Sequence, residues 1–271
     1  MENDKPRKHR AVESRHAPFV QRTVTEIWLE KSTSDNPYIA SQVYCHGYDL
    51  LELMKQRSFA EVLFLLFIGE LPTAQQTQLL EATMVGLITP GPRHPATRAA
   101  MSAAVGKTNP LHILPIGTAV LGGNYLGAGT IEEVMNFFHQ YQSSDVDSTF
   151  KELIQREKNH PNQIPGFGKR YGGTDPIAAD IAAHLASLDA AGKALIWGEQ
   201  LANKLAPFGQ GWLITGVAAA VFTDLGIPSH LGGPLYQLMS APGLLAQAAE
   251  LIKKPITAMP FVTDDQYHVE R

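Results

Sequence analysis

The sequence predicts a mainly α-helical protein, and three observations support this. Apolar residues recur at spacings of three and four over most of the chain, which is the pattern of helices that face a core. The only strand-like stretch is Val20–Leu29, and the sequence contains no fixed-period repeat. With 271 residues, of which 44% are hydrophobic, the chain is long and apolar enough for one sizeable domain with a large core.

The expected helices follow one another with few interruptions. The first apolar stripe starts at Leu50 and stops before Thr73, which is an expected N-cap for the next helix. Asp175 is a second expected N-cap, with Pro176 in the first helical position. The small residues of Gly216–Ala220 predict a close helix–helix approach, for which a subunit interface is modestly favoured over the core. The later helices are expected at Ala74–Leu87, Ala96–Val105, Leu111–Leu121, Ile131–Tyr141, Val146–Glu157, Ile177–Leu188, Gly192–Leu205, Trp212–Asp224 and Gly243–Lys253.

Composition argues against several classes of function. A net charge of −4 and a pI of about 6.2 give no electrostatic basis for binding nucleic acid or an anionic membrane. The longest apolar run, Val62–Ile68, is far shorter than the roughly 20 residues of a membrane span. The histidines are spaced singly, so no metal site is expected. The single cysteine, Cys45, excludes an internal disulfide and fits a cytoplasmic location.

The first 19 residues are expected to form a flexible basic tail. Lys5–Arg10 carries most of the positive charge, and the segment lacks the apolar stretch of a secretory signal. A solvated tail is favoured over an arm that grips phosphate or a partner.

Five stretches resemble, in the same order, sequence motifs of the citrate synthase superfamily, which includes citrate synthase, 2-methylcitrate synthase and citryl-CoA lyase. They extend from about Tyr44 to Glu250, and the short chain is most similar in length to the citryl-CoA lyase branch. The stretches are His46–Leu53 (RGYDI-x-EL in the family), Phe59–Thr73 (F-x-EV…GELPT), Pro165–Pro176 (PGFGHRxY…DPR), Leu213–Gly226 (NVDG…DLG) and Ala241–Gln247 (GLIAH).

The resemblance implies a multi-helical citrate synthase-like fold with a large and a small subdomain. The domain would span residues 20–271, with the small subdomain inserted at about 160–245. It also implies a homodimer that acts on a coenzyme A thioester and a small organic acid, without any other cofactor.

Members of the family deprotonate the methyl group of acetyl-CoA or run the reverse cleavage. A carboxylate is the base, one histidine hydrogen-bonds the enolate, a second polarises the ketone, and arginines bind the carboxylates of the acceptor. This chemistry requires a base of suitable pKa, preorganised donors at an oxyanion and bidentate cations.

The proton-transfer groups of the family are replaced in this sequence. The position of the base holds Thr215, whose unactivated hydroxyl is no base near neutral pH. The ketone-polarising histidine is replaced by Lys169, a flexible cation. The slot of the enolate histidine holds Leu126 or Tyr125, with Asn124 nearby. The positional equivalents of the catalytic groups are therefore Lys169, Thr215 and Asn124.

The anion-binding groups are replaced too. The family's DPR arginine, late arginine, GLIAH histidine and early histidine correspond to Ile177, about Ser240, Gln247 and Pro90. His94, next to Arg93, is interpreted as a surface imidazole between prolines, or alternatively as a group that moves into the space of the early histidine. Arg170 is equally consistent with a carboxylate or phosphate ligand and with a surface salt bridge. Arg170, His94 and Arg93 are thus the candidate substrate-binding residues.

Three functions remain open. The first is an acyltransferase or lyase with altered chemistry, and the second is a non-catalytic paralogue, a pseudoenzyme, that binds acyl-CoA, an organic acid or a protein partner. The third is a structural subunit of an assembly. Acid–base catalysis supplies about 10²–10⁴-fold and one oxyanion donor about 10²–10³-fold, so standard citrate synthesis is not expected after the loss of all three groups.

Overall fold

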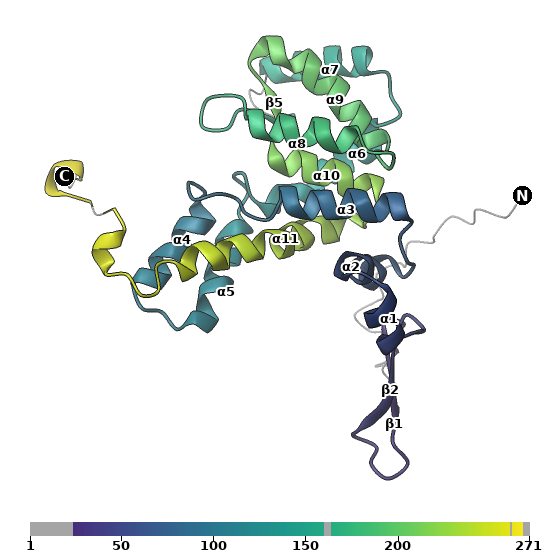
Figure 1. Ribbon diagram of the computed structural model, residues 1–271. Coiled ribbons are helices and arrows are strands. Elements are labelled where there is room, and N and C mark those ends of the chain that lie inside the picture. Colours follow the sequence, from purple (N-terminus) through teal and green to yellow (C-terminus); the bar gives the residue numbers. More distant parts are fainter. Residues whose placement is uncertain (1–23, 160–163, 261, 268–271) are drawn as a thin grey trace, which may run out of the picture. The chain divides into compact units, whose positions relative to one another are not determined.

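The computed structural model describes residues 24–159, 164–260 and 262–267 (Figure 1). The expected basic tail, residues 1–19, lies outside the described residues. The chain divides into two compact units, Met1–Gln56 and Arg57–Arg271. The observed division falls between the first two helices. The citrate synthase-like domain over residues 20–271, with a small subdomain at about 160–245, stays a prediction.

The first unit is a small antiparallel sheet followed by one helix. Strands β1 (Trp28–Ser32), β2 (Ala40–Cys45) and β3 (Tyr48–Asp49) lie in the order β1-β2-β3, and α1 spans Leu50–Gln56. Of the strand predicted over Val20–Leu29, the last two residues lie in β1, residues 24–27 lie outside any strand, and residues 20–23 lie outside the described residues; β2 was not predicted. Apolar and polar residues do not alternate along β2, so its sequence lacks the period-two pattern of a strand, and the strand is identified by its pairing with β1.

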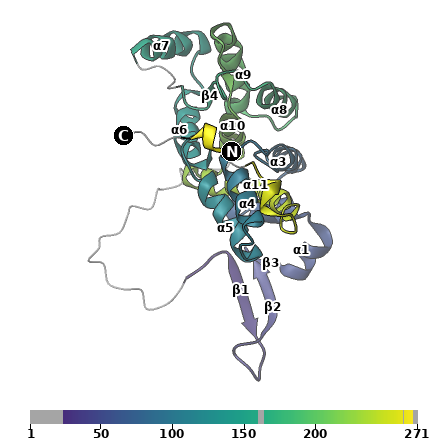
Figure 2. The same ribbon diagram turned by 90° about the vertical axis from the view of Figure 1, so that its left-hand side faces the viewer.

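The second unit confirms the mainly α-helical prediction. Its core lies where α10 packs on α6 and α9, and where α11 packs on α4, α5 and α6 (Figures 1 and 2). Its helices are α2 (Phe59–Ile68), α3 (Ala74–Gly86), α4 (Pro95–Val105), α5 (Pro110–Leu121), α6 (Ile131–Tyr141), α7 (Val146–Asn159), α8 (Pro176–Ala186), α9 (Lys193–Leu205), α10 (Ile214–Asp224) and α11 (Ser229–Ala249). Strands β4 (Phe167–Gly168) and β5 (Gly211–Trp212) form a short antiparallel pair. Single 3₁₀ turns occupy Ala128–Thr130, Ala206–Phe208, Ile256–Ala258 and Asp264–Gln266.

Helix α11 is longer than its sequence predicts. The pattern predicted only Gly243–Lys253, whereas the helix runs for 21 residues and contains two internal prolines. A β-carbon at Gly232 would overlap with Met135, and one at Gly233 would lie 2.8 Å from the carbonyl oxygen of Ala128. This close packing on its neighbours outweighs the backbone hydrogen bonds that the prolines remove.

Helix α10 is the most buried helix of the second unit. Every residue from Thr215 to Thr223 is buried within the chain itself. The modest preference for a subunit interface at Gly216–Ala220 is therefore wrong, because these small residues pack in the core of one chain. The spacing of small residues in a sequence does not distinguish a helix packed in the core of one chain from a helix packed at a subunit interface.

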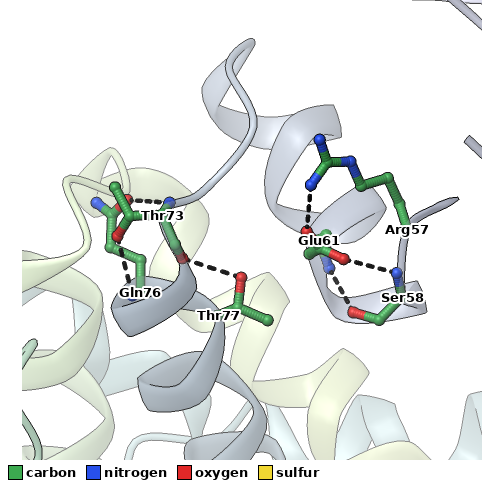
Figure 3. Close-up of polar contacts among 6 residues, drawn as sticks. All are labelled: Arg57, Ser58, Glu61, Thr73, Gln76 and Thr77. Atoms are coloured by element: carbon green, nitrogen blue, oxygen red, sulfur yellow. Dashed lines mark hydrogen bonds and ion pairs between the residues drawn. The ribbon is translucent and has the colours of Figure 1, made fainter.

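Two helices begin with reciprocal caps of the same geometry (Figure 3). At α2, the amide of Glu61 donates to the Ser58 hydroxyl (3.3 Å) and the Glu61 carboxylate accepts from the Ser58 amide (2.8 Å). At α3, Thr73 and Gln76 make the same pair of bonds, at 3.2 and 2.9 Å. The first box is charged and the second is neutral. The hydrogen bond from the Ser58 amide, more than the nearby Arg57, lowers the pKa of Glu61.

The two caps predict different pH dependences. Glu61→Ala and Gln76→Ala should each lower the free energy of unfolding by about 1 kcal/mol at pH 7. Because the pKa of Glu61 is lowered from 4.5 in the folded state, its contribution is present above the unfolded-state pKa and lost as pH falls through the folded-state pKa. Urea unfolding at pH 7 and at about pH 3 should show the Glu61→Ala effect shrinking and the Gln76→Ala effect unchanged. Equal pH dependence of the two variants would contradict this account.

Candidate functional site

A close backbone contact connects the turn before β4 to the start of α10. The Gly166 carbonyl accepts a hydrogen bond from the Leu213 amide (3.0 Å), and Phe167 pairs with Trp212 in the two-stranded sheet. A β-carbon on Gly216 would overlap with the carbonyl of Gly166, so only glycine fits there. Gly166 itself has φ +82°, which also favours glycine. The contact between Gly166 and Gly216 therefore holds the turn before β4 close to the start of α10.

A cleft of about 760 Å³ opens beside this contact. Asn124, Lys169 and Thr215 all line it, so the three positional equivalents from the sequence lie around one space. Thr215 is buried, while Asn124 and Lys169 are exposed. Among the described residues that line the cleft there is no histidine, and Lys169 is the one cation.

Glu133 is a carboxylate of the cleft that sequence reasoning missed. It lies in the first turn of α6 and is exposed. It is also the one acidic residue among the described residues of the cleft lining. No family motif includes it, and an acidic residue in a first helical turn ordinarily indicates a dipole interaction. The sequence therefore held no signal for its place in the cleft.

The loop between α5 and α6 forms one wall of the cleft. Leu126 has φ +54°, a left-handed conformation that is uncommon for a residue with a branched side chain. A β-carbon on Gly127 would overlap with backbone carbonyls of the same loop, and one on Gly129 would overlap with the Asn124 side chain. Close backbone packing at these glycines fixes the conformation of the loop.

His94 is buried, with 4% of its surface exposed, and the surface-loop interpretation is wrong. Its Nδ1 accepts from the Ala96 amide (3.1 Å), which makes His94 the N-cap of α4. Its Nε2 lies 3.1 Å from the Leu126 carbonyl oxygen. Since Nδ1 accepts, the neutral ring must donate from Nε2 to Leu126. Burial lowers the pKa of His94, more than the Leu126 hydrogen bond raises it, so the ring is neutral near pH 7.

Arg170 makes a partly buried ion pair. Its Nη1 lies 2.7 Å from Asp175 Oδ2, and the side chain is 28% exposed. The other oxygen of Asp175 caps α8 by accepting from the Ile177 and Ala178 amides, as the sequence predicted. The open choice between a ligand and a salt bridge for Arg170 is answered in part, because the salt bridge is present.

Two further cavities adjoin Arg170. The inner cavity has a volume of about 10 Å³. Its lining consists of four polar side chains, His94, Arg170, Asp175 and Tyr236, and four apolar ones, Pro90, Leu126, Leu213 and Ile214. The outer one, about 420 Å³, is lined by Arg93 and Arg170 with the Arg170–Ile177 turn. Burial raises the pKa of Tyr236 to about 12, so its hydroxyl stays protonated. The candidate binding residues Arg93, His94 and Arg170 therefore lie around these two cavities. None of them lines the cleft of about 760 Å³ that holds Lys169, called the Lys169 cleft below.

The remaining replaced positions have structural partners or lie at the surface. The Ser240 hydroxyl donates to the Leu87 carbonyl (3.0 Å), and the Gln247 amide donates to the Thr89 hydroxyl (2.6 Å). Ile177 is 62% exposed at the outer cavity. Ser240 and Gln247 thus stabilise the packing of α11 on the segment after α3.

Neither a metal cluster nor a membrane span is found in the part of the chain that the structure describes. No group of three or more histidine, cysteine or acidic residues there could hold a metal ion. Within the same residues, no helix combines the length and apolarity needed to cross a bilayer.

Gly216→Ala should destabilise the second unit by roughly 1–3 kcal/mol, because the added methyl group overlaps with the Gly166 backbone. Gly173→Ala is the matched control, since a β-carbon there would meet no atom within 4 Å. Thermal unfolding followed by circular dichroism measures both. Equal melting temperatures for the two variants would show that the close contact is absent.

His94 should make stability fall as pH falls below about 6.5. Its pKa is lowered from 6.5 in the folded state, so the unfolded chain takes up the proton first. The neutral ring's contribution is therefore present above the unfolded-state pKa and is lost toward the folded-state pKa, by at most about 1.4 kcal/mol per pH unit. His94→Asn keeps a capping side chain and should flatten the slope measured by urea unfolding. The exposed His112→Asn should leave the slope as it is, and equal slopes for wild type and His94→Asn would refute the assignment.

No protein-family model and no curated protein sequence matches the chain significantly. Among solved structures, the chain is similar to citryl-CoA lyase from Hydrogenobacter thermophilus, with 26% identity over 92% of this chain and 95% of that one and a TM-score of 0.73. ATP citrate lyase from Methanothrix soehngenii, in complex with citrate and coenzyme A, is 14% identical, with a TM-score of 0.68. That match covers 100% of this chain, which spans only 48% of that protein. Citrate synthase from Thermotoga maritima is 14% identical over 93% of this chain and 96% of that one, with a TM-score of 0.54. The last two share the fold alone. The order of the sequence motifs and the likeness to citryl-CoA lyase place the chain in the citrate synthase-like superfamily.

Proposed function

We propose that the protein binds an acyl-CoA thioester or a small organic acid in the Lys169 cleft without the proton transfers of citrate synthases and citryl-CoA lyases. The observation that carries the proposal is the composition of the cleft. Asn124, Lys169 and Thr215 surround one space, and none of them is an acid–base group suited to deprotonating a thioester.

The polar groups of the cleft suit an anionic or carbonyl-containing ligand. Lys169 supplies a mobile ammonium group, and Asn124 and Thr215 supply neutral hydrogen-bonding groups. A volume of about 760 Å³ lies within the range of small-molecule sites. The thioester carbonyl or a single carboxylate would be held by Lys169, with the amide and hydroxyl orienting it.

Thr215 is the strongest argument against turnover. It is 2% exposed at the position that the motif order gives to the family's catalytic aspartate, and an unactivated hydroxyl does not accept a carbon-bound proton near neutral pH. The described residues of the cleft hold no histidine that would activate it. The proposed function is therefore ligand binding without catalysis.

The similar proteins support the ligand class. One of them is a citryl-CoA lyase, and another is an ATP citrate lyase solved with citrate and coenzyme A. The proposal extends only that ligand class to this chain. A homodimer and a cytoplasmic location, both expected from the sequence, are part of the same proposal.

A second candidate is an enzyme with altered chemistry, and Glu133 favours it. This carboxylate lines the same cleft as Lys169 and could serve as a base in place of the missing aspartate. Its position on α6 differs from that of Thr215 on α10, so such an enzyme would approach its substrate from another side.

Calorimetry with acetyl-CoA, coenzyme A and citrate tests the proposal. Wild-type protein should bind at least one of them, and Lys169→Ala should weaken that binding by about tenfold to a hundredfold through loss of a charged hydrogen bond. Lys193→Ala, on α9 and away from the cleft, is the control and should bind as wild type does.

Turnover is measured separately with the same samples. Neither thiol release from acetyl-CoA and oxaloacetate nor cleavage of citryl-CoA is expected. Turnover that Glu133→Gln abolishes would replace the binding proposal with the altered enzyme. Absence of binding to all three compounds would leave the structural role.

A further inference from the structure

Leu126 lies between the Lys169 cleft and the inner cavity. It lines both spaces, as does Leu213 at the start of α10. Lys169 and Thr215 lie on the cleft side, whereas Arg170 lies on the other side. The two leucines thus form an apolar partition between a lysine and an arginine that are adjacent in sequence.

The partition is held in place by several independent contacts. The Leu126 carbonyl accepts from the buried His94 ring (3.1 Å), and the Leu126 side chain is itself buried. Its φ of +54° persists only because the surroundings impose it. Gly127 has no room for a β-carbon in the same loop. These contacts keep Leu126 at the wall and out of solvent.

Arg170 has an ion-pair partner on its own side of the partition. Its guanidinium is paired with Asp175 (2.7 Å). The inner cavity of about 10 Å³ holds a water molecule at most, so no carboxylate fits beside Arg170 there. The outer cavity also contacts Arg170, but it does not share Leu126 or Leu213 with the cleft.

We propose that Leu126 determines specificity by keeping Arg170 out of the ligand cleft. A dicarboxylate or tricarboxylate needs more than one cation to offset the cost of desolvating its charges. Among the described residues of the cleft, Lys169 alone supplies a cation. The cleft therefore selects a single carboxylate or a thioester carbonyl and rejects dicarboxylates and tricarboxylates such as citrate. This inference rests on the proposed binding function of the same cleft.

The test removes the wall and then the arginine. Leu126→Gly deletes the side chain and suits the left-handed backbone, and Leu213→Ala thins the wall from the α10 side. Calorimetry with citrate and with acetyl-CoA measures each variant. Citrate affinity should rise about tenfold or more in Leu126→Gly, as expected for a newly reachable charged hydrogen bond, and should rise less in Leu213→Ala.

The gain should depend on Arg170. Adding Arg170→Gln to Leu126→Gly should abolish the gain, whereas the exposed Arg98→Gln on α4 should preserve it. Circular dichroism and melting temperature establish that each variant is folded. Where Leu126→Gly fails to fold, Leu213→Ala with and without Arg170→Gln provides the test.

Two results would overturn the inference. One is a folded Leu126→Gly or Leu213→Ala protein with unchanged citrate affinity. The other is an equal effect of Arg170→Gln on citrate affinity with and without the wall, since Arg170 would then already face the ligand. Failure of wild-type protein to bind acetyl-CoA and the other compounds contradicts the proposed function instead, because the citrate gain is read on the variants.

Discussion

The candidate site depends on the close approach of two backbones at Gly166 and Gly216. Without side chains at these positions, the carbonyl of Gly166 reaches the first turn of α10 and accepts from the Leu213 amide. This contact sets the distance between the turn that carries Lys169 and the helix that carries Thr215. Helix α10 is buried along its length and packed in the rigid core. The contact therefore fixes the position of the Lys169 turn relative to this helix, and with it the shape of the cleft.

The burial of the polar groups near the cleft, more than their residue type, determines their protonation state and their hydrogen-bond partners. His94 is neutral because its environment excludes water, and both ring nitrogens are committed to backbone groups. Asp175 serves Arg170 with one oxygen and the start of α8 with the other. His94 and Asp175 are costly to redirect toward a ligand, since each would leave a buried partner unsatisfied. The exposed Lys169 carries no such commitment.

Local signals made most of the helices predictable, and long-range packing explains the exceptions. Thr73 and Asp175 were found as caps because capping uses neighbouring residues. The start of α11 was missed because its glycines and prolines read as breakers, and only contact with distant helices makes them helical. The motif order placed Lys169 and Thr215 together, while Glu133 and the burial of His94 depend on how α6 and the loop before it pack. Such contacts leave no periodicity in the sequence.

The residues that the motif order aligns with the family's catalytic groups also contribute to the packing of this chain. A carboxylate at Thr215 would be buried on a core helix and would need a raised pKa or a partner, and a threonine avoids that desolvation. The enolate position falls on Leu126 or Tyr125, and in this segment Leu126 is buried and its carbonyl accepts a hydrogen bond from His94. Active-site groups commonly reduce stability for the sake of activity. Under the proposed binding function, Leu126 and Thr215 are buried in the walls of the cleft, and Lys169 is the one cation among the described residues that line it.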